Sequence, residues 1–97
     1  MTDKQKEKCS EILEYYGFEK QREILVEECA ELIQAVSKTK RSGKKITDNF
    51  IEELADVWVS CLYIREASNI SDEELNKAIN VKIQRIKDKI TADGWYQ

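Results

Sequence analysis

Residues 50–64 read FIEELADVWVSCLYI and carry the strongest structural signal in the chain. At about 100° per residue, their apolar side chains cover almost the whole circumference of an α-helix. The exceptions, Glu53, Asp56 and Ser60, share one narrow polar arc. A helix that is apolar on nearly all sides is normally enclosed by its neighbours. The pattern therefore predicts a central, buried helix with two acids on its one polar face.

The segments before this helix predict two more helices, because the chain has no proline and only three glycines. The first is expected at about residues 3–16 and ends or bends at Gly17. The second is expected at about residues 18–38, where apolar side chains recur at helical spacing. Residues 39–45, TKRSGKK, then predict a polar, basic loop.

Cap residues mark where the last two helices begin. Thr47 or Asp48 can cap the helix that starts near residue 50 and runs to about residue 67. Ser71 and Glu74 form a capping box for a helix at about residues 72–91. Four helices and no strand pattern predict an all-α fold. The last helix carries an apolar stripe of Leu75, Ile79, Ile83, Ile86 and Ile90.

The length and charge of the chain restrict its class. With 97 residues it fits one all-α domain, residues 1–97, and a chain this short gains from association with copies of itself. A net charge of -3 argues against nucleic-acid binding through a basic face. No signal peptide or long apolar run is present, so we expect a cytoplasmic protein without a membrane segment.

Histidine is absent, and the chain has three cysteines. The absence of histidine excludes imidazole-based zinc sites, Ser-His-Asp triads and Cys-His pairs. Cys9, Cys29 and Cys61 match no zinc or redox spacing, and each lies beside apolar residues in a helical pattern. We therefore interpret them as buried, reduced thiols.

Four acids form the candidate site. Glu28 and Glu31 lie on the second predicted helix at the same spacing as Glu53 and Asp56 on the third. That spacing sets two side chains about 60° apart, on one face of a helix. Four carboxylates inside a bundle would repel one another, unless they bind protons or a cation. Oxygen ligands without histidine or cysteine favour Mg²⁺, or Mn²⁺, over zinc. The alternative is that the acids face solvent.

The last predicted helix carries the cations Lys82, Arg85 and Lys89 at helical spacing. They form a basic strip on one flank of its apolar stripe. Mg²⁺ held by carboxylates usually meets a phosphate substrate, and cations that converge on such an ion suit a polyphosphate. The basic strip therefore predicts phosphate binding; the alternative is an ordinary solvated flank paired with nearby acids.

The two acidic segments resemble a known family. Residues 25–32 read LVEECAEL and residues 52–57 read EELADV. Their acids are similar to the E-x-x-E…E-x-x-D motif of the MazG-like, all-α nucleoside triphosphate pyrophosphohydrolases. The resemblance covers about residues 17–90, which is most of the chain.

This resemblance implies hydrolysis of a (deoxy)nucleoside triphosphate between its α and β phosphates, which releases a monophosphate and pyrophosphate. It implies Mg²⁺ at the four acids Glu28, Glu31, Glu53 and Asp56. It also implies a four-helix bundle-type fold completed by oligomerisation, as a homodimer or homotetramer. On the last helix, the family's basic positions are matched by Lys82 and Arg85, with Asn80 as a further candidate.

The reaction also needs a group that accepts a proton from the attacking water. Because histidine is absent, no imidazole base is available, and a carboxylate not fully used by the metal can accept the proton. Glu27 and Glu31 are both candidates, and the sequence does not choose between them. Glu27 and its counterpart Glu52 lie further round their helices, so solvent is the alternative position for both.

Base recognition has several candidates. Trp58, Tyr63, Trp95 and Tyr96 can stack on a nucleobase. The position of Trp58 also fits the core, which the helical pattern favours. Gln21, near the start of the second helix, is a candidate to read a base edge.

Three rival interpretations remain. Phosphoribosyl-ATP pyrophosphatases have a similar length and a related carboxylate pattern, but residues 57–63, VWVSCLY, lack the histidine-bearing segment expected there. Dimeric dUTP or dCTP hydrolases use similar sites. A non-enzymatic helical oligomer, such as an adaptor, would leave buried acids without compensation.

Overall fold

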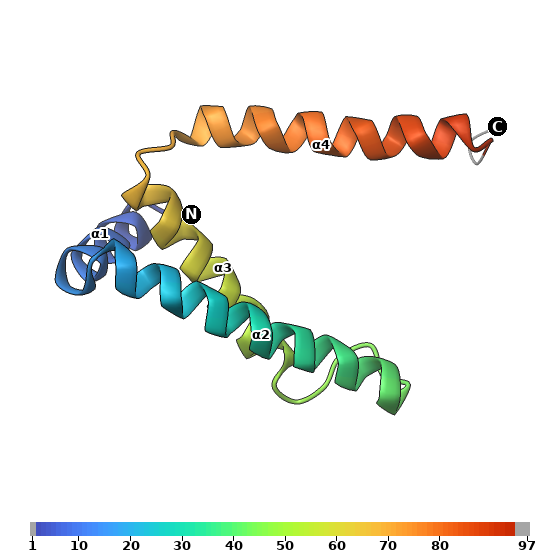
Figure 1. The fold of residues 1–97 in the computed structure, drawn as a ribbon, viewed down its shortest axis with the longest axis horizontal. Helices are drawn as coiled ribbons and strands as arrows, with labels where there is room; N and C mark the ends of the chain where they lie inside the picture. Colours follow the sequence, from blue (N-terminus) through green and yellow to red (C-terminus); the bar gives the residue numbers. More distant parts are fainter. Residues whose placement is uncertain (1, 95–97) are drawn as a thin grey trace.

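The computed structural model describes residues 2–94, and these form four helices without a strand (Figure 1). The helices are α1 (Asp3–Tyr16), α2 (Phe18–Ser42), α3 (Phe50–Ala67) and α4 (Asp72–Ala92). The predicted all-α class is therefore confirmed. None of these helices combines the length and the apolar character that crossing a membrane requires.

Capping boxes start both α1 and α4. At α4, Ser71 Oγ accepts a hydrogen bond from the Glu74 N–H at 3.0 Å, and Glu74 Oε1 accepts one from the Ser71 N–H at 3.3 Å. This confirms the predicted start of α4. At α1, Thr2 Oγ1 accepts from the Gln5 N–H at 3.1 Å, and Gln5 Oε1 accepts from the Thr2 N–H at 2.8 Å. Both boxes satisfy backbone donors that the first turn of a helix leaves free.

The second helix is longer than predicted, because α2 continues through Ser42. The loop expected at residues 39–45 is therefore wrong over its first four positions. Their threonine, lysine, arginine and serine side chains tolerate a helix as well as a loop. The helix ends only at Gly43, whose φ of 73° lies in the left-handed region that glycine adopts without steric cost.

The predicted cap of α3 is also wrong. The residue before the helix is Asn49, and its side chain makes no capping hydrogen bond. Thr47 contributes its backbone carbonyl, which accepts from the Phe50 N–H at 3.0 Å. The Thr47 hydroxyl is buried and finds no partner among residues 2–94. Neither Thr47 nor Asp48 therefore caps α3 through its side chain.

Three of the helices pack together, and the fourth does not. α2 and α3 lie side by side and antiparallel, and α1 packs against the first part of α2 and the last part of α3 (Figure 1). Beyond its first turn, α4 packs on no other described helix. The radius of gyration is 16.8 Å, whereas a compact chain of this length has about 13 Å. One chain alone therefore does not close a four-helix bundle.

The position of α4 leaves α3 open, so the prediction of a buried central helix is wrong for the single chain. Ile51 is 67% exposed and Trp58 is 66% exposed. On α3, burial is restricted to Ser60 and Arg65. The apolar stripe of α4 is also exposed over most of its length. The apolar surfaces of both helices lack a neighbour because α4 projects away from the other three.

The three cysteines are free thiols. Cys9 is buried as predicted, and Cys29 is half-buried. The prediction is wrong for Cys61, which is exposed. Its exposure has the same cause, because Cys61 and Trp58 line the surface of α3 that α4 leaves uncovered.

The fourth helix is held at its first residue. Asp72 Oδ2 accepts from Lys6 Nζ of α1 at 2.9 Å, and Asp72 Oδ1 pairs with Arg65 Nη1 of α3 at 2.8 Å. Arg65 is buried, and Nη1 also donates to the Ile70 carbonyl at 3.2 Å. These contacts fix where α4 starts, while the rest of α4 extends away from the packed helices (Figure 1).

Candidate metal centre

The antiparallel pairing of α2 with α3 brings the four predicted acids together. One carboxylate oxygen from each of Glu28, Glu31, Glu53 and Asp56 lies within 4.8 Å of the others. The spacing within each pair places both acids on the side of the helix that faces its neighbour. Glu28 interacts most strongly with Asp56, and Glu53 with Glu31, as an antiparallel register requires. We name these four residues the carboxylate cluster.

Burial and crowding destabilise the charged state of the carboxylate cluster. Glu28 and Glu53 are half-buried, whereas Glu31 and Asp56 are exposed. Burial raises the pKa of Glu28 above its ordinary value, and the nearby charges of Asp56 and Glu31 raise it further. Burial also raises the pKa of Glu53, as does its close contact with Glu31. A bound proton or cation would therefore stabilise Glu28 and Glu53 in the folded chain.

The donor atoms fit a hard divalent ion. Glu28 Oε2 and Glu53 Oε2 are buried, and neither has a hydrogen-bond partner within the described part of the chain. Opposite ligands of Mg²⁺ or Ca²⁺ lie about 4 to 5 Å apart, which agrees with a spread of at most 4.8 Å in the carboxylate cluster. All four ligands offer oxygen, and such a set suits Mg²⁺ or Mn²⁺. The four residues could therefore hold one metal ion.

A hollow of about 250 Å³ opens beside the carboxylate cluster. Glu28 and Asp56 contribute its acidic lining, and Ser60, which is 3% exposed, also lines it. Burial raises the pKa of Tyr63, another lining residue, so its hydroxyl stays protonated as a donor. The hollow provides space for a ligand next to the acids.

The walls of this hollow include residues that the sequence did not single out. Ile24 and Val59 supply apolar surface, and Ala55 supplies little side-chain volume. The signal for Ala55 was its place directly before Asp56, where a small side chain leaves room beside the acid.

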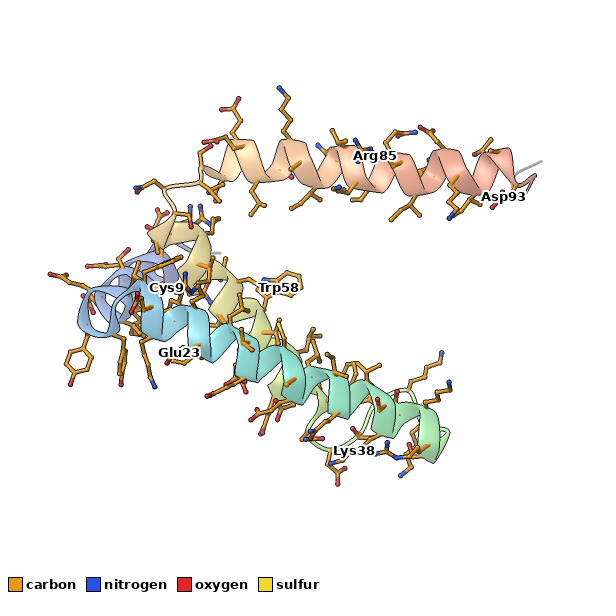
Figure 2. All side chains as sticks on the ribbon, in the orientation of Figure 1. Cys9, Glu23, Lys38, Trp58, Arg85 and Asp93 are labelled. Carbon is orange, nitrogen blue, oxygen red and sulfur yellow. The ribbon has the colours of Figure 1, made fainter. Side chains whose placement is uncertain are left out.

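The predicted phosphate-binding residues lie elsewhere. Asn80, Lys82, Arg85 and Lys89 are all on α4 and are exposed. Beyond its first turn α4 packs on no other described helix, so one chain does not bring these residues to the carboxylate cluster. Figure 2 shows Arg85 on α4, apart from the α2–α3 pair.

Two predictions about individual side chains need correction. Gln21 is 1% exposed, so it does not reach a base edge. It lies four residues before Leu25 and seven before Glu28, on the packed face of α2, and that spacing was visible in the sequence. The core interpretation of Trp58 is wrong, because its side chain projects from α3 on the side of α4 (Figure 2).

The remaining candidates divide into two groups. Glu27 is exposed on α2 and lies outside the carboxylate cluster, as does Glu52 on α3. Trp95 and Tyr96, the other candidates for base stacking, lie outside the described residues.

A comparison with protein families matches residues 17–92 to the MazG nucleotide pyrophosphohydrolase domain. The match includes α2, α3 and α4, and therefore all four members of the carboxylate cluster. No curated protein and no solved structure matches the chain. Because the matched segment covers most of the chain and contains the paired acidic helices, this protein belongs to the MazG nucleotide pyrophosphohydrolase family.

Proposed function

We propose that the chain hydrolyses (deoxy)nucleoside triphosphates to nucleoside monophosphate and pyrophosphate, with Mg²⁺ or Mn²⁺ held by the carboxylate cluster. The observation that carries this proposal is the pair of buried, unpartnered oxygens of Glu28 and Glu53, with Glu31 and Asp56 completing the set within 4.8 Å. Membership of a nucleotide pyrophosphohydrolase family gives the reaction class.

The position of each acid around the ion would follow from its exposure to solvent. Glu28 and Glu53 would hold the ion from the inside, because both are half-buried. Glu31 and Asp56 would complete the ligand set on the exposed side, where a triphosphate arrives from solvent. When bound, a divalent ion neutralises charge on phosphate oxygens and lowers the pKa of a water molecule.

A carboxylate would accept the proton of the attacking water. Glu27 is exposed and lies outside the carboxylate cluster, one turn before Glu31, which lies within it. Glu27→Gln and Glu31→Gln separate the two candidates. A variant that loses turnover but keeps its affinity for the ion has lost the base. A variant that loses both has lost a ligand.

A second copy of the chain would complete the site. The apolar stripe of α4 and the open surface of α3 are both exposed in one chain, and burial of such surfaces stabilises by about 25 cal/mol per Å². We therefore propose a homodimer or homotetramer in which α4 of one chain covers another. Lys82, Arg85 and Lys89, with Asn80, would then contact the phosphates bound by the partner.

The test is a pyrophosphate-release assay with every common NTP and dNTP, and with phosphoribosyl-ATP, in the presence and absence of Mg²⁺. We expect release only with the metal. Glu53→Gln should reduce it by at least about 100-fold while keeping the helical circular dichroism signal, because it removes one ligand. Glu52→Gln is the matched control, since Glu52 lies outside the carboxylate cluster. Pyrophosphate from no nucleotide would contradict the proposed function and favour a non-enzymatic role.

A further inference from the structure

A second, larger hollow lies between α1 and α3, and we name it the α1–α3 groove. Its volume is about 370 Å³, within the range of small-molecule sites. Most of its surface is apolar, and its walls include Ile12 and Leu62. Trp58 also lines it, so one aromatic ring faces the space that a planar ligand would occupy.

The α1–α3 groove lies next to the hollow beside the carboxylate cluster, because the two share lining residues. Val59 and Tyr63 line both spaces. The second space also contains Glu28 and Asp56. A nucleotide whose phosphates meet those acids therefore has an adjacent, mostly apolar space for its base, with Trp58 and Tyr63 as stacking surfaces.

The polar groups of the α1–α3 groove are hydrogen-bond donors. Gln5 Oε1 already accepts the Thr2 N–H at 2.8 Å, so the carboxamide has its NH₂ group left for a ligand. Lys8 offers an ammonium group. The Tyr63 hydroxyl and the Cys9 thiol can also donate. No carboxylate lines this groove among the described residues.

We propose that the α1–α3 groove binds the nucleobase of the substrate, and that Gln5 and Lys8 select bases with a keto oxygen at position 4 of a pyrimidine or position 6 of a purine. This proposal rests on the proposed function. Uracil, thymine and guanine present an acceptor at that position, whereas cytosine and adenine present an amino donor. An amino group that faces the donors of Gln5 and Lys8 cannot form a hydrogen bond with either of them. The amino group and both donors are then left without partners. The keto substrates are therefore favoured by at least about tenfold in kcat/KM.

Gln5→Glu tests this selection without removing the cap. Glutamate at this position still forms a capping box with Thr2, and its second oxygen replaces the donor NH₂ with an acceptor. We expect the ratio of kcat/KM for dUTP over dCTP to fall by at least about tenfold. Lys8→Met should reduce the same ratio, whereas Lys4→Met, on the same helix but outside the groove, should leave it unchanged. A ratio that Gln5→Glu does not move would overturn the proposal.

A binding measurement separates this proposal from the proposed function. The chain has two tryptophans, so Trp95→Phe leaves Trp58 as the only fluorophore of that kind. In the presence of Mg²⁺, the non-hydrolysable α,β-imido analogue of dUTP should quench this emission. The concentration needed should be at least about tenfold lower than for the α,β-imido analogue of dCTP. Pyrophosphate release without quenching or base preference would reject the groove and keep the enzyme. Quenching and preference without release would reject the reaction and keep the groove. Emission that responds only to protein concentration would assign the groove to a second copy and overturn the proposal.

Discussion

Glu28 and Glu53 would link the proposed metal binding to stability through their raised pKa values. A carboxyl group with a higher pKa in the folded state binds protons more tightly there than in the unfolded chain. Its charged form therefore destabilises the fold above the raised pKa. That cost disappears as the pH falls below the ordinary value of 4.5. A divalent ion removes the same cost at neutral pH, because it compensates the charge directly.

This sign predicts how pH and Mg²⁺ act together. The increase in melting temperature caused by Mg²⁺ should be largest near pH 8 and should shrink towards pH 5, where protons compete for the same oxygens. With a chelator present, Glu53→Gln should melt at a higher temperature than the original chain near pH 8. This difference in melting temperature should shrink as the pH falls. Thermal melts at several pH values, with EDTA or Mg²⁺, measure both effects. Stabilisation by Mg²⁺ that is equal at pH 5 and pH 8 would speak against a carboxylate site.

Gln21 provides an independent prediction about packing. Its side chain is 1% exposed, and Oε1 has no hydrogen-bond partner within residues 2–94. A buried polar group without a partner costs stability, so Gln21→Leu should raise the free energy of unfolding by about 1 kcal/mol. Urea denaturation measures the change, with Gln34→Leu at an exposed position of α2 as the control. A loss of stability in Gln21→Leu would contradict this account of the unpartnered oxygen.

Local sequence predicts where some of the helices begin and end better than others. The start of α4 was predictable because Ser71 and Glu74 satisfy each other's backbone donors within four residues. The end of α2 was not, since the side chains at residues 39–42 allow both a helix and a loop. The cap of α3 was predicted wrongly because Thr47 contributes a backbone carbonyl, where a side-chain cap was expected.

The attachment of α4 gives a prediction about one exposed residue. Lys6 and Arg65 lower the pKa of Asp72 through a hydrogen bond and their charges, and Asp72 raises the pKa of Lys6. The stabilisation from this pair is present above the ordinary pKa of Asp72, 3.8, and is lost as the pH falls through its lowered value. The part of this stabilisation that comes from Lys6 is also lost at high pH, as Lys6 deprotonates.

Asp72→Asn should therefore lower the melting temperature at pH 7, because it removes a charged partner of the buried Arg65 as well as the exposed pair with Lys6. Glu73→Gln, in the same helical turn but outside the pair, is the matched control. The difference between the two variants should disappear in strong acid. A difference that persists there would show that Asp72 acts through something other than its charge.

The four members of the carboxylate cluster could be chosen from sequence because helical spacing is local and the antiparallel pairing of α2 with α3 follows from a short loop. The place of α4 could not be predicted in the same way. Its apolar stripe shows that it needs a partner surface, but periodicity does not say whether that surface belongs to its own chain or to another. The burial of α3 was overestimated for the same reason, since Trp58 and Ile51 are exposed in a single chain.

The proposed assembly predicts that one charge on the α4 stripe should separate the subunits. Ile83 is 53% exposed in a single chain, and Ile83→Glu would place an unpaired carboxylate in the interface. Light scattering after size exclusion should show a dimer or tetramer for the original chain and a smaller species for this variant, with at least about tenfold less pyrophosphate release. Lys77→Glu, on another face of α4, should change neither. A monomeric original chain with full activity would contradict this arrangement.

The central claim, that the carboxylate cluster is a divalent-metal site, is tested most directly by calorimetric titration of Mn²⁺ into the metal-free chain. We expect saturable binding that releases protons below neutral pH, because Glu28 and Glu53 hold them more tightly than free carboxyls do. Glu53→Gln should weaken this binding by at least about tenfold, and Glu52→Gln should leave it within about twofold. Absence of binding, or equal affinity in the original chain and Glu53→Gln, would contradict the claim.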